Sequence, residues 1–289
     1  MMNRRSLLSI ALAAALAGGA DAAPRGSSGL KTIHKRIGGR LGVHVLDSQS
    51  GKRIGYDDDS RYPMASTCKV PLAAALLWQV DHDAFPLTHE LPISREQLLP
   101  NSPVVEQRLA AGMEAMSVRD LCAAAVSYSD NTAANVLFTG IGGPEALTRF
   151  IRSIGDEVTR FDRNEPELNI NPAGDERDTT TPRAMTDTML KIFTQDVMSV
   201  ASRAFLIDWM SQTRNGLDRV RAGLPHNWQA GDKIGTSPNT AYNDLVIAWP
   251  PGRRPILISV FMSGSTLAPP ELSAAQAEIG ALVAREKWP

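Results

Sequence analysis

Strand-like segments near both ends of the chain, separated by a long helical stretch, constrain the fold more than any other feature of the sequence. Residues 41–47 and 53–56 have the composition of strands and are joined by a polar turn that contains glycine. Residues 228–234, 244–249 and 256–262 predict three further strands near the C-terminus. This order favours one sheet that is built from both ends of the chain, with the helices inserted between them.

Two helices can be placed by their end signals and spacing. One is expected to begin at Pro144 and to end before Gly155, because proline is favoured at the first helical position and glycine just past the last. Its apolar residues, among them Leu147 and Ile151, recur at helical spacing. A last amphipathic helix is predicted over about residues 273–287.

Residues 155–182 interrupt this regular pattern. The segment is polar, rich in charged residues and broken by Pro166 and Pro172. A connection of this length inside a compact domain is usually functional or disordered.

The first 22 residues have the pattern of a secretory signal. Arg4 and Arg5 precede an apolar run that ends at Ala20, and residues 20–22 resemble a cleavage site. The run is too short to span a bilayer, although an uncleaved anchor is the alternative. We therefore expect a periplasmic or secreted protein, exported by the Sec route or by the twin-arginine route that the paired arginines leave open. A flexible segment is expected at residues 23–29.

Charge and cysteine content exclude several classes of protein. The chain has 289 residues and a net charge of −1, so no basic field predicts binding to nucleic acid or stable association with a membrane. Its two cysteines, Cys68 and Cys122, are too few for a disulfide scaffold, although export would allow them to form a bridge. The histidines are scattered, and no motif predicts a metal site.

Ser66 and Lys69 open the apolar segment of residues 65–77, which is expected to be a buried helix. Residues three apart share a helix face, so the hydroxyl and the amine should point the same way. A neutral lysine can accept the proton of a serine, and backbone N–H groups at a helix start can stabilise an oxyanion. Taken alone, the pair is better explained as a helix cap and a solvated lysine than as a catalytic pair. Pro71 is expected to cost this helix a hydrogen bond or to kink it.

Three further motifs follow in a fixed order. Ser129-Asp130-Asn131 comes after a helical segment, residues 163–169 read Arg-Asn-Glu-Pro-Glu-Leu-Asn, and Lys233-Ile234-Gly235-Thr236 ends a predicted strand. With the S-x-x-K motif before them, this set resembles the class A serine β-lactamases over about residues 30–288. Each motif alone could be a helix cap or a solvated charge; the order of the set carries the resemblance.

The resemblance implies an α/β (α+β) fold of the β-lactamase/transpeptidase type. It would combine a five-stranded antiparallel sheet and its flanking helices with an all-helical domain. The implied boundaries are residues 30–62 and 209–289 for the α/β domain, and residues 63–208 for the helical domain, including the 155–182 loop. The active site would lie between the two domains.

The implied reaction is hydrolysis of the lactam amide of a β-lactam by a monomeric enzyme that needs neither a metal nor an organic cofactor. Ser66 would be the nucleophile and would carry the acyl group. Lys69 and Glu165 are the two candidate bases for acylation, and Glu165 would also activate the water that removes the acyl group. Ser129 would pass a proton to the departing nitrogen.

The remaining site residues also follow from the resemblance. Arg163 and Asp178 would form the ion pair that pins the long loop. The residues expected to bind the substrate or to position the attacking water are Asn131, Asn169, Lys233, Gly235, Thr236, Ser237 and Arg219.

The sequence departs from the family pattern at the substrate site. Ile234 stands where a threonine or serine commonly helps to bind the substrate carboxylate, and Asn101 stands where an aromatic residue usually walls the site. Arg219 stands where other members carry a carboxylate-binding arginine, whereas Arg221 is expected to be a surface charge.

The cysteines depart from the pattern as well. In some members the residue matching Cys122 forms a disulfide, but Ala73 occupies the partner position here. Both thiols are therefore predicted to be free.

Two other functions are consistent with parts of this pattern. A penicillin-binding D-alanyl-D-alanine peptidase or transpeptidase shares the serine–lysine chemistry but lacks a dedicated deacylating carboxylate, so Glu165 and Asn169 argue against it. A non-catalytic β-lactam-binding sensor would not need the complete set of polar catalytic groups.

Overall fold

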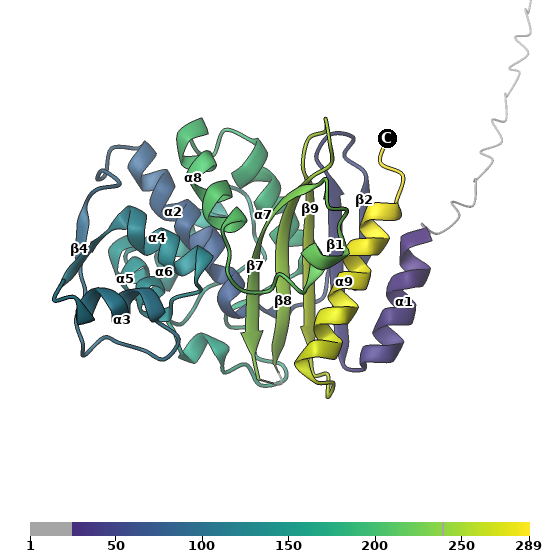
Figure 1. Ribbon diagram of the computed structural model, residues 1–289, viewed down its shortest axis with the longest axis horizontal. Helices are drawn as coiled ribbons and strands as arrows, with labels where there is room; N and C mark the ends of the chain where they lie inside the picture. The colour runs from purple at the N-terminus through teal and green to yellow at the C-terminus, as the bar shows by residue number, and fades with distance from the viewer. Residues whose placement is uncertain (1–24, 239) are drawn as a thin grey trace, which may run out of the picture.

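A five-stranded antiparallel sheet forms the centre of the computed structural model, which describes residues 25–238 and 240–289 (Figure 1). The strands lie in the order β2-β1-β9-β8-β7. Their bounds are Arg40–Asp47 for β1, Arg53–Tyr56 for β2, Gln229–Ser237 for β7, Ala241–Trp249 for β8 and Ile256–Ser263 for β9. Because β1 pairs with β9, the sheet joins the two ends of the chain, and the predicted arrangement is confirmed.

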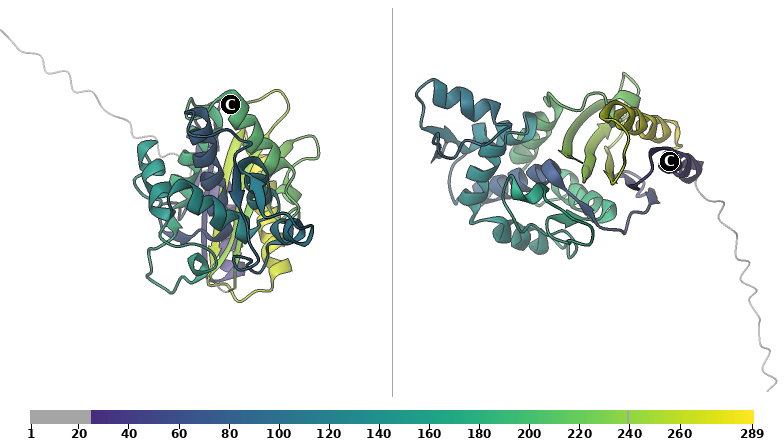
Figure 2. Two further views of the ribbon diagram at one scale, coloured as in Figure 1. Left: turned by 90° about the vertical axis from the view of Figure 1, so that its left-hand side faces the viewer. Right: turned by 90° about the horizontal axis from the view of Figure 1, so that it is seen from below.

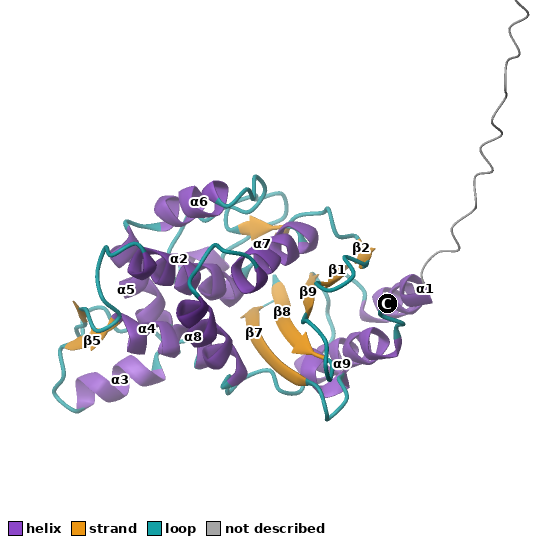
Figure 3. Cartoon of the chain, turned by 90° about the horizontal axis from the view of Figure 1, so that it is seen from above, coloured by secondary structure: helices purple, strands orange, loops and turns teal. Residues whose placement is uncertain are grey.

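Helices cover both faces of this sheet (Figure 3). One face carries α1 (Arg25–Ile37) and α9 (Pro269–Arg285), and α7 (Pro182–Thr194) and α8 (Val200–Ser211) contact strands from the other side. Figure 2 shows the same layers from two further directions. The other helices lie beyond β7, away from α1 and α9: α2 (Lys69–Asp81), α3 (Pro103–Ala110), α4 (Val118–Ser127), α5 (Asn131–Ile141) and α6 (Pro144–Ser153).

Side chains of the central strands alternate between two apolar cores. In β9, Ile258 and Val260 belong to the core beneath α1 and α9, whereas Leu257 and Phe261 belong to the core shared with the other helices. This follows from the two-residue repeat of a strand, and it explains why β8 and β9 are apolar along almost their whole length. The second core continues from the sheet into the helices, so the domain boundaries expected at residues 62/63 and 208/209 stay a prediction.

Short elements place the remaining segments. Two-stranded pairings join β3 (Tyr62–Pro63) to β6 (Thr179–Thr180) and β4 (Glu90–Pro92) to β5 (Ala115–Ser117). The β3–β6 pair fixes the end of the 155–182 connection beside the segment that leads into Ser66. Among the described residues, three 3₁₀ turns complete the list of elements: η1 (Ala65–Cys68), η2 (Glu167–Asn169) and η3 (Val220–Gly223).

The helix expected over residues 65–77 begins differently from the prediction. Its first turn is η1, and the α-helix itself starts at Lys69. Pro71 therefore lies in the first turn of α2, where backbone N–H groups have no partner within the α-helix. Proline is tolerated at such a position. The prediction that Pro71 would disrupt the helix is therefore wrong.

The predicted export signal, residues 1–22, lies outside the described residues. Of the segment 23–29, the structure places residues from Arg25 onward in α1. Within the described part of the chain, none of the helices combines the length and the apolar character needed to cross a membrane.

Both thiols are free and buried, Cys68 in η1 and Cys122 in α4. Burial raises the pKa of each thiol well above its usual range. We therefore predict that neither thiol reacts rapidly in the native protein, because the thiolate is the reactive form. Titration of the unfolded, unreduced protein should find both thiols. Finding neither would mean that Cys68 and Cys122 form a bridge.

Candidate active site

The candidate site lies where the edge strand β7 meets the start of the helical part of the chain. Ala65 has a left-handed backbone, with φ of +46°, and turns the chain into η1 directly before Ser66. A Cβ atom at Gly235 would lie 2.5 Å from the carbonyl oxygen of Met64. Only glycine therefore allows β7 to approach η1 this closely, which gives the predicted Gly235 a structural reason.

Lys69 is fully buried, and its ammonium group is the centre of the site. The Nζ atom lies 3.0 Å from Ser66 Oγ and 3.1 Å from Glu165 Oε1. It also donates to the carbonyl oxygen of Ser129 at 2.9 Å and to Asn131 Oδ1 at 2.6 Å. A cation without water needs such partners, so Lys69 is not the solvated lysine that the motif alone would allow.

The Ser129-Asp130-Asn131 turn is held by Asp130. Its Oδ1 accepts from the backbone N–H of Ala133 at 2.8 Å and caps α5, while Oδ2 accepts from the backbone N–H groups of Val104 and Val105 in α3. Ser129 itself has φ of +59°. Because Asp130 caps the helix, the side chains of Ser129 and Asn131 are available to the site.

Lys233 reaches the same turn from β7. Its Nζ atom donates to Ser129 Oγ at 3.0 Å and to the carbonyl oxygen of Ile234 at 2.9 Å. Burial, together with the positive charge of Lys69, lowers the pKa of Lys233 to about 7. Ser129 Oγ thus lies between two lysines, because Lys69 Nζ is 3.5 Å away on its other side.

Glu165 is buried and is held in place at both its side chain and its main chain. Glu165 Oε2 accepts from Asn169 Nδ2 at 2.6 Å. Asn135 in α5 accepts from the backbone N–H of Glu165 at 2.9 Å and donates to its carbonyl oxygen at 2.7 Å. Asn135 was not among the site residues predicted from the sequence, although it lies four residues after Asn131 and therefore on the same face of α5.

The predicted ion pair of the long connection is present. Arg163 Nε lies 2.6 Å from Asp178 Oδ2, and both side chains are largely buried. Asp178 Oδ1 also accepts from the backbone N–H groups of Asp162 at 2.8 Å and Arg163 at 3.0 Å. These contacts close the segment that carries Glu165 and Asn169.

Arg219 lies against the end of β7 and is buried. It donates to Thr236 Oγ1 at 2.6 Å and to the carbonyl oxygen of Asn243 at 2.8 Å. Its guanidinium carbon lies 3.7 Å from the ring centroid of Tyr242, so the aromatic ring orients the guanidinium plane. Ser237 extends the same strand end to the long connection, because its Oγ donates to the carbonyl oxygen of Asn169 at 3.0 Å.

Arg221 is not the surface charge that the sequence analysis expected. It donates to Asp232 Oδ1 at 2.9 Å, and Asp232 is fully buried. Burial raises the pKa of Asp232 to about 6 in spite of this arginine. The prediction was wrong because the partner lies on β7, where the sequence gives no sign of the contact.

The structure shows what surrounds the two residues that depart from the family pattern, Ile234 and Asn101. Ile234 packs on Gly216, where a Cβ atom would lie 2.2 Å from Ile234 Cγ2. Asn101 is exposed and has φ of +60°, a conformation that asparagine tolerates, and its side chain donates to the carbonyl oxygen of Ser129 at 3.3 Å.

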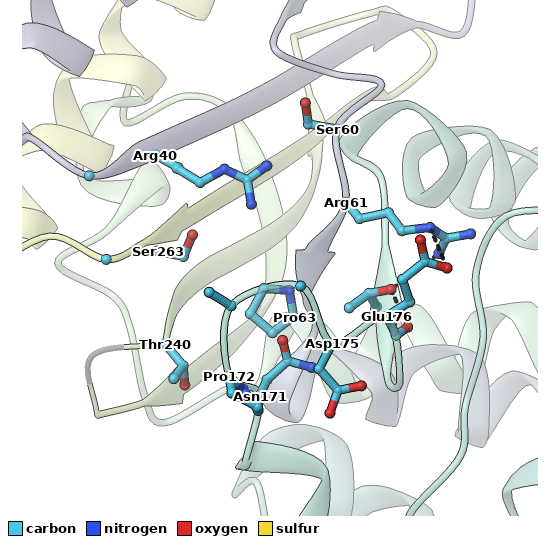
Figure 4. Close-up of a pocket in the computed structure, with 15 residues that line it drawn as sticks. Arg40, Ser60, Arg61, Pro63, Asn171, Pro172, Asp175, Glu176, Thr240 and Ser263 are labelled. Carbon is cyan, nitrogen blue, oxygen red and sulfur yellow. Dashed lines mark hydrogen bonds and ion pairs between the residues drawn. The ribbon is translucent and has the colours of Figure 1, made fainter.

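A separate cavity of about 560 Å³ lies beside the far part of the long connection (Figure 4). Arg40, Asn171 and Asp175 are among its lining residues, and no predicted site residue lines it. It therefore does not belong to the site around Ser66.

Chemically, the site combines a partly exposed serine hydroxyl with a buried amine and a buried carboxylate. Lys233 donates a hydrogen bond to Ser129, and Arg219 donates one to Thr236. A negatively charged ligand could therefore be held between the two basic side chains. Across residues 25–238 and 240–289, no group of three or more His, Cys, Asp or Glu side chains is arranged to hold a metal ion.

The chain has many relatives. Residues 27–286 match the Beta-lactamase enzyme family. Beta-lactamase L2 of Stenotrophomonas maltophilia is 41% identical over 92% of this chain and 87% of its own length. The carbapenem-hydrolyzing beta-lactamase KPC of Klebsiella oxytoca is also 41% identical, over 79% of this chain and 78% of its own.

Solved structures agree in fold. An ancestral class A β-lactamase is 48% identical and superposes with a TM-score of 0.87, covering 90% of this chain and 98% of its own. A β-lactamase of Xanthomonas campestris is 43% identical with a TM-score of 0.86, covering 89% of this chain and 95% of its own. The family match, the relatives and the shared fold together make this chain a member of the class A β-lactamases.

Proposed function

We propose that the protein hydrolyses the lactam amide of β-lactam antibiotics through an acyl-enzyme on Ser66. The observation that carries the proposal is the buried amine of Lys69, which lies 3.0 Å from Ser66 Oγ and 3.1 Å from Glu165 Oε1. The relatives named above, which are β-lactamases, support the reaction class.

In the acylation step, Ser66 Oγ attacks the lactam carbonyl carbon and loses its proton to a base. Lys69 and Glu165 are both candidates, because Lys69 Nζ lies within hydrogen-bond distance of Ser66 and beside Glu165. The carbonyl π electrons move to oxygen, where the backbone N–H groups of Ser66 and Thr236 would stabilise the charge. The C–N bond then breaks, and the nitrogen takes a proton from Ser129. Ser129 regains the proton that the base removed from Ser66 by way of Lys69 Nζ, which lies 3.5 Å from Ser129 Oγ.

In the deacylation step, a water molecule attacks the ester carbonyl carbon. Glu165 accepts the proton of this water. As the bond between the ester carbon and the Ser66 oxygen breaks, this proton passes from Glu165 through Lys69 to the Ser66 oxygen. Asn169 supports this role because it fixes Glu165 Oε2 at 2.6 Å, and Asn135 fixes the main chain of Glu165. A penicillin-binding peptidase would not require this arrangement.

Substrate binding would depend mainly on the end of β7. The substrate carboxylate would be bound by Lys233, Arg219, Thr236 and Ser237. Arg219 would supply a contact in place of the hydroxyl group that Ile234 lacks. Asn131 would bind the amide of the substrate side chain. We also propose that the enzyme acts outside the cytoplasm, on the basis of its N-terminal export pattern. We propose that it acts as a monomer, as the family resemblance implies.

Replacing Glu165 tests the deacylation step. In E165Q, acylation should be slowed and deacylation nearly abolished, because the amide cannot accept the proton of water. Mass spectrometry after exposure to a penicillin should find a persistent adduct on Ser66. E167Q is the matched control, since Glu167 is exposed in the same segment and should leave turnover intact. Parental turnover in E165Q would refute the role of Glu165.

Replacing Arg219 tests carboxylate binding. R219A should lower kcat/KM by about one to two powers of ten, because a charge-assisted hydrogen bond contributes about 1.5–3 kcal/mol. R254A is the control, since Arg254 is exposed in the turn between β8 and β9. R221A should instead lower the melting temperature, because it leaves the buried Asp232 without its cation. Equal small effects of R219A and R254A on kcat/KM would contradict the assignment.

The charge of Lys233 should make catalysis depend on pH. The pKa of Lys233 is lowered to about 7 in the free enzyme, so this lysine is charged below that pH and neutral above it. Since kcat/KM reports the free enzyme, its value should fall as the pH rises through this range. K233R keeps the charge and should move this limb of the profile to higher pH. The same limb in both proteins would show that Lys233 does not control it.

A further inference from the structure

A second cavity, of about 340 Å³, lies at the end of the sheet where β7 turns into β8. The start of α9 is at this same end of the molecule (Figure 1). The walls are mostly apolar and come from four elements or their connections, with Pro238, Tyr242, Met262, Leu267 and Leu272 among the lining residues. A volume of this order is enough for one ring-sized group.

This cavity is continuous with the groups proposed to hold the substrate carboxylate. Thr236 and Ser237 line it, and Thr236 is exposed. The hydroxyl of Thr236 accepts from Arg219 at 2.6 Å, and the same guanidinium stacks on Tyr242, another lining residue. A ligand whose carboxylate meets Thr236 and Arg219 therefore places the atoms next to that carboxylate at the mouth of the cavity.

We propose that this cavity receives an apolar substituent that the substrate carries on the carbon next to the one bearing its carboxylate. Cephalosporins carry their 3-substituent at this position, whereas penicillins have only two methyl groups on the carbon next to the one that bears their carboxylate. The apolar lining would bury the substituent, and the polar residues at its mouth would hold the carboxylate. The inference rests on the proposed function, since it assumes that a β-lactam occupies the site.

The first test measures the parental enzyme with a series of cephalosporins. Their 3-substituent, on the carbon next to the one that bears the carboxylate, is an alkyl group of increasing length. It is bonded through carbon, so that it is not expelled as a leaving group. The kcat/KM value should rise by up to about fourfold for each methylene that becomes buried. It should stop rising when the cavity is full. A series without any rise would overturn the inference.

The second test fills the cavity. Leu267 is a half-buried lining residue, and Thr266 beside it is exposed and does not line the cavity. L267W should lower kcat/KM at least about tenfold for the longest cephalosporin of the series and less than about twofold for a penicillin, whereas T266W should change neither. Equal effects of L267W on both substrates, or no effect on either, would overturn the inference.

The two tests separate this inference from the proposed function. If the parental enzyme hydrolyses neither class of substrate, the proposed function fails. If it hydrolyses both but shows no dependence on the 3-substituent, only the cavity assignment fails. Melting curves of L267W and T266W check that both variants are folded, and the alkyl series remains decisive if L267W is not.

Discussion

The buried ammonium group of Lys69 is the interaction on which the rest of the site depends. Removing a cation from water is costly by several kcal/mol, so the fold must surround it with oxygen atoms. Here those oxygens come from Ser66 beside it, from the turn at residues 129–131 and from Glu165 on the long connection. Three segments far apart in the sequence are thereby brought to one nitrogen atom, and each has its own support. Asp130 caps α5 and binds α3, while Asn135 holds the main chain of Glu165.

The edge strand β7 supplies the other wall of the site and connects chemistry to recognition. Glycine at position 235 lets the strand approach η1, and Lys233 on the same strand joins Ser129. The opposite face of the strand carries Thr236 toward Arg219, whose guanidinium is oriented by Tyr242. The chain thus lacks the usual hydroxyl group at Ile234, but it has a buried arginine, Arg219, that is hydrogen-bonded to Thr236 at the end of the same strand. The 340 Å³ cavity begins at this same place, so binding of the carboxylate and choice of its neighbouring substituent would depend on shared residues.

Much of this could be predicted from the sequence, because it depends on local patterns. Strand composition at both ends of the chain predicted a sheet built from both termini. The family resemblance carried by the order of four motifs implied which residues meet around Ser66. Contacts set by tertiary packing could not be predicted. Nothing in the sequence around Arg221 indicates that its partner is the buried carboxylate of Asp232, eleven residues away on β7. The role of Asn135 depends on how the long connection lies over α5, and the effect of Pro71 depends on where a 3₁₀ turn gives way to the α-helix.

The most direct test of the central claim is the rate at which a penicillin acylates Ser66 when the buried amine is replaced by an apolar side chain of similar length. Rapid-quench mass spectrometry of K69M, compared with the parental enzyme, measures this rate without relying on steady-state turnover. We expect a loss of at least about a hundredfold in a protein that is still folded, whichever of Lys69 and Glu165 is the base, because Lys69 orients both Ser66 and Glu165. Acylation of folded K69M at the parental rate would contradict it.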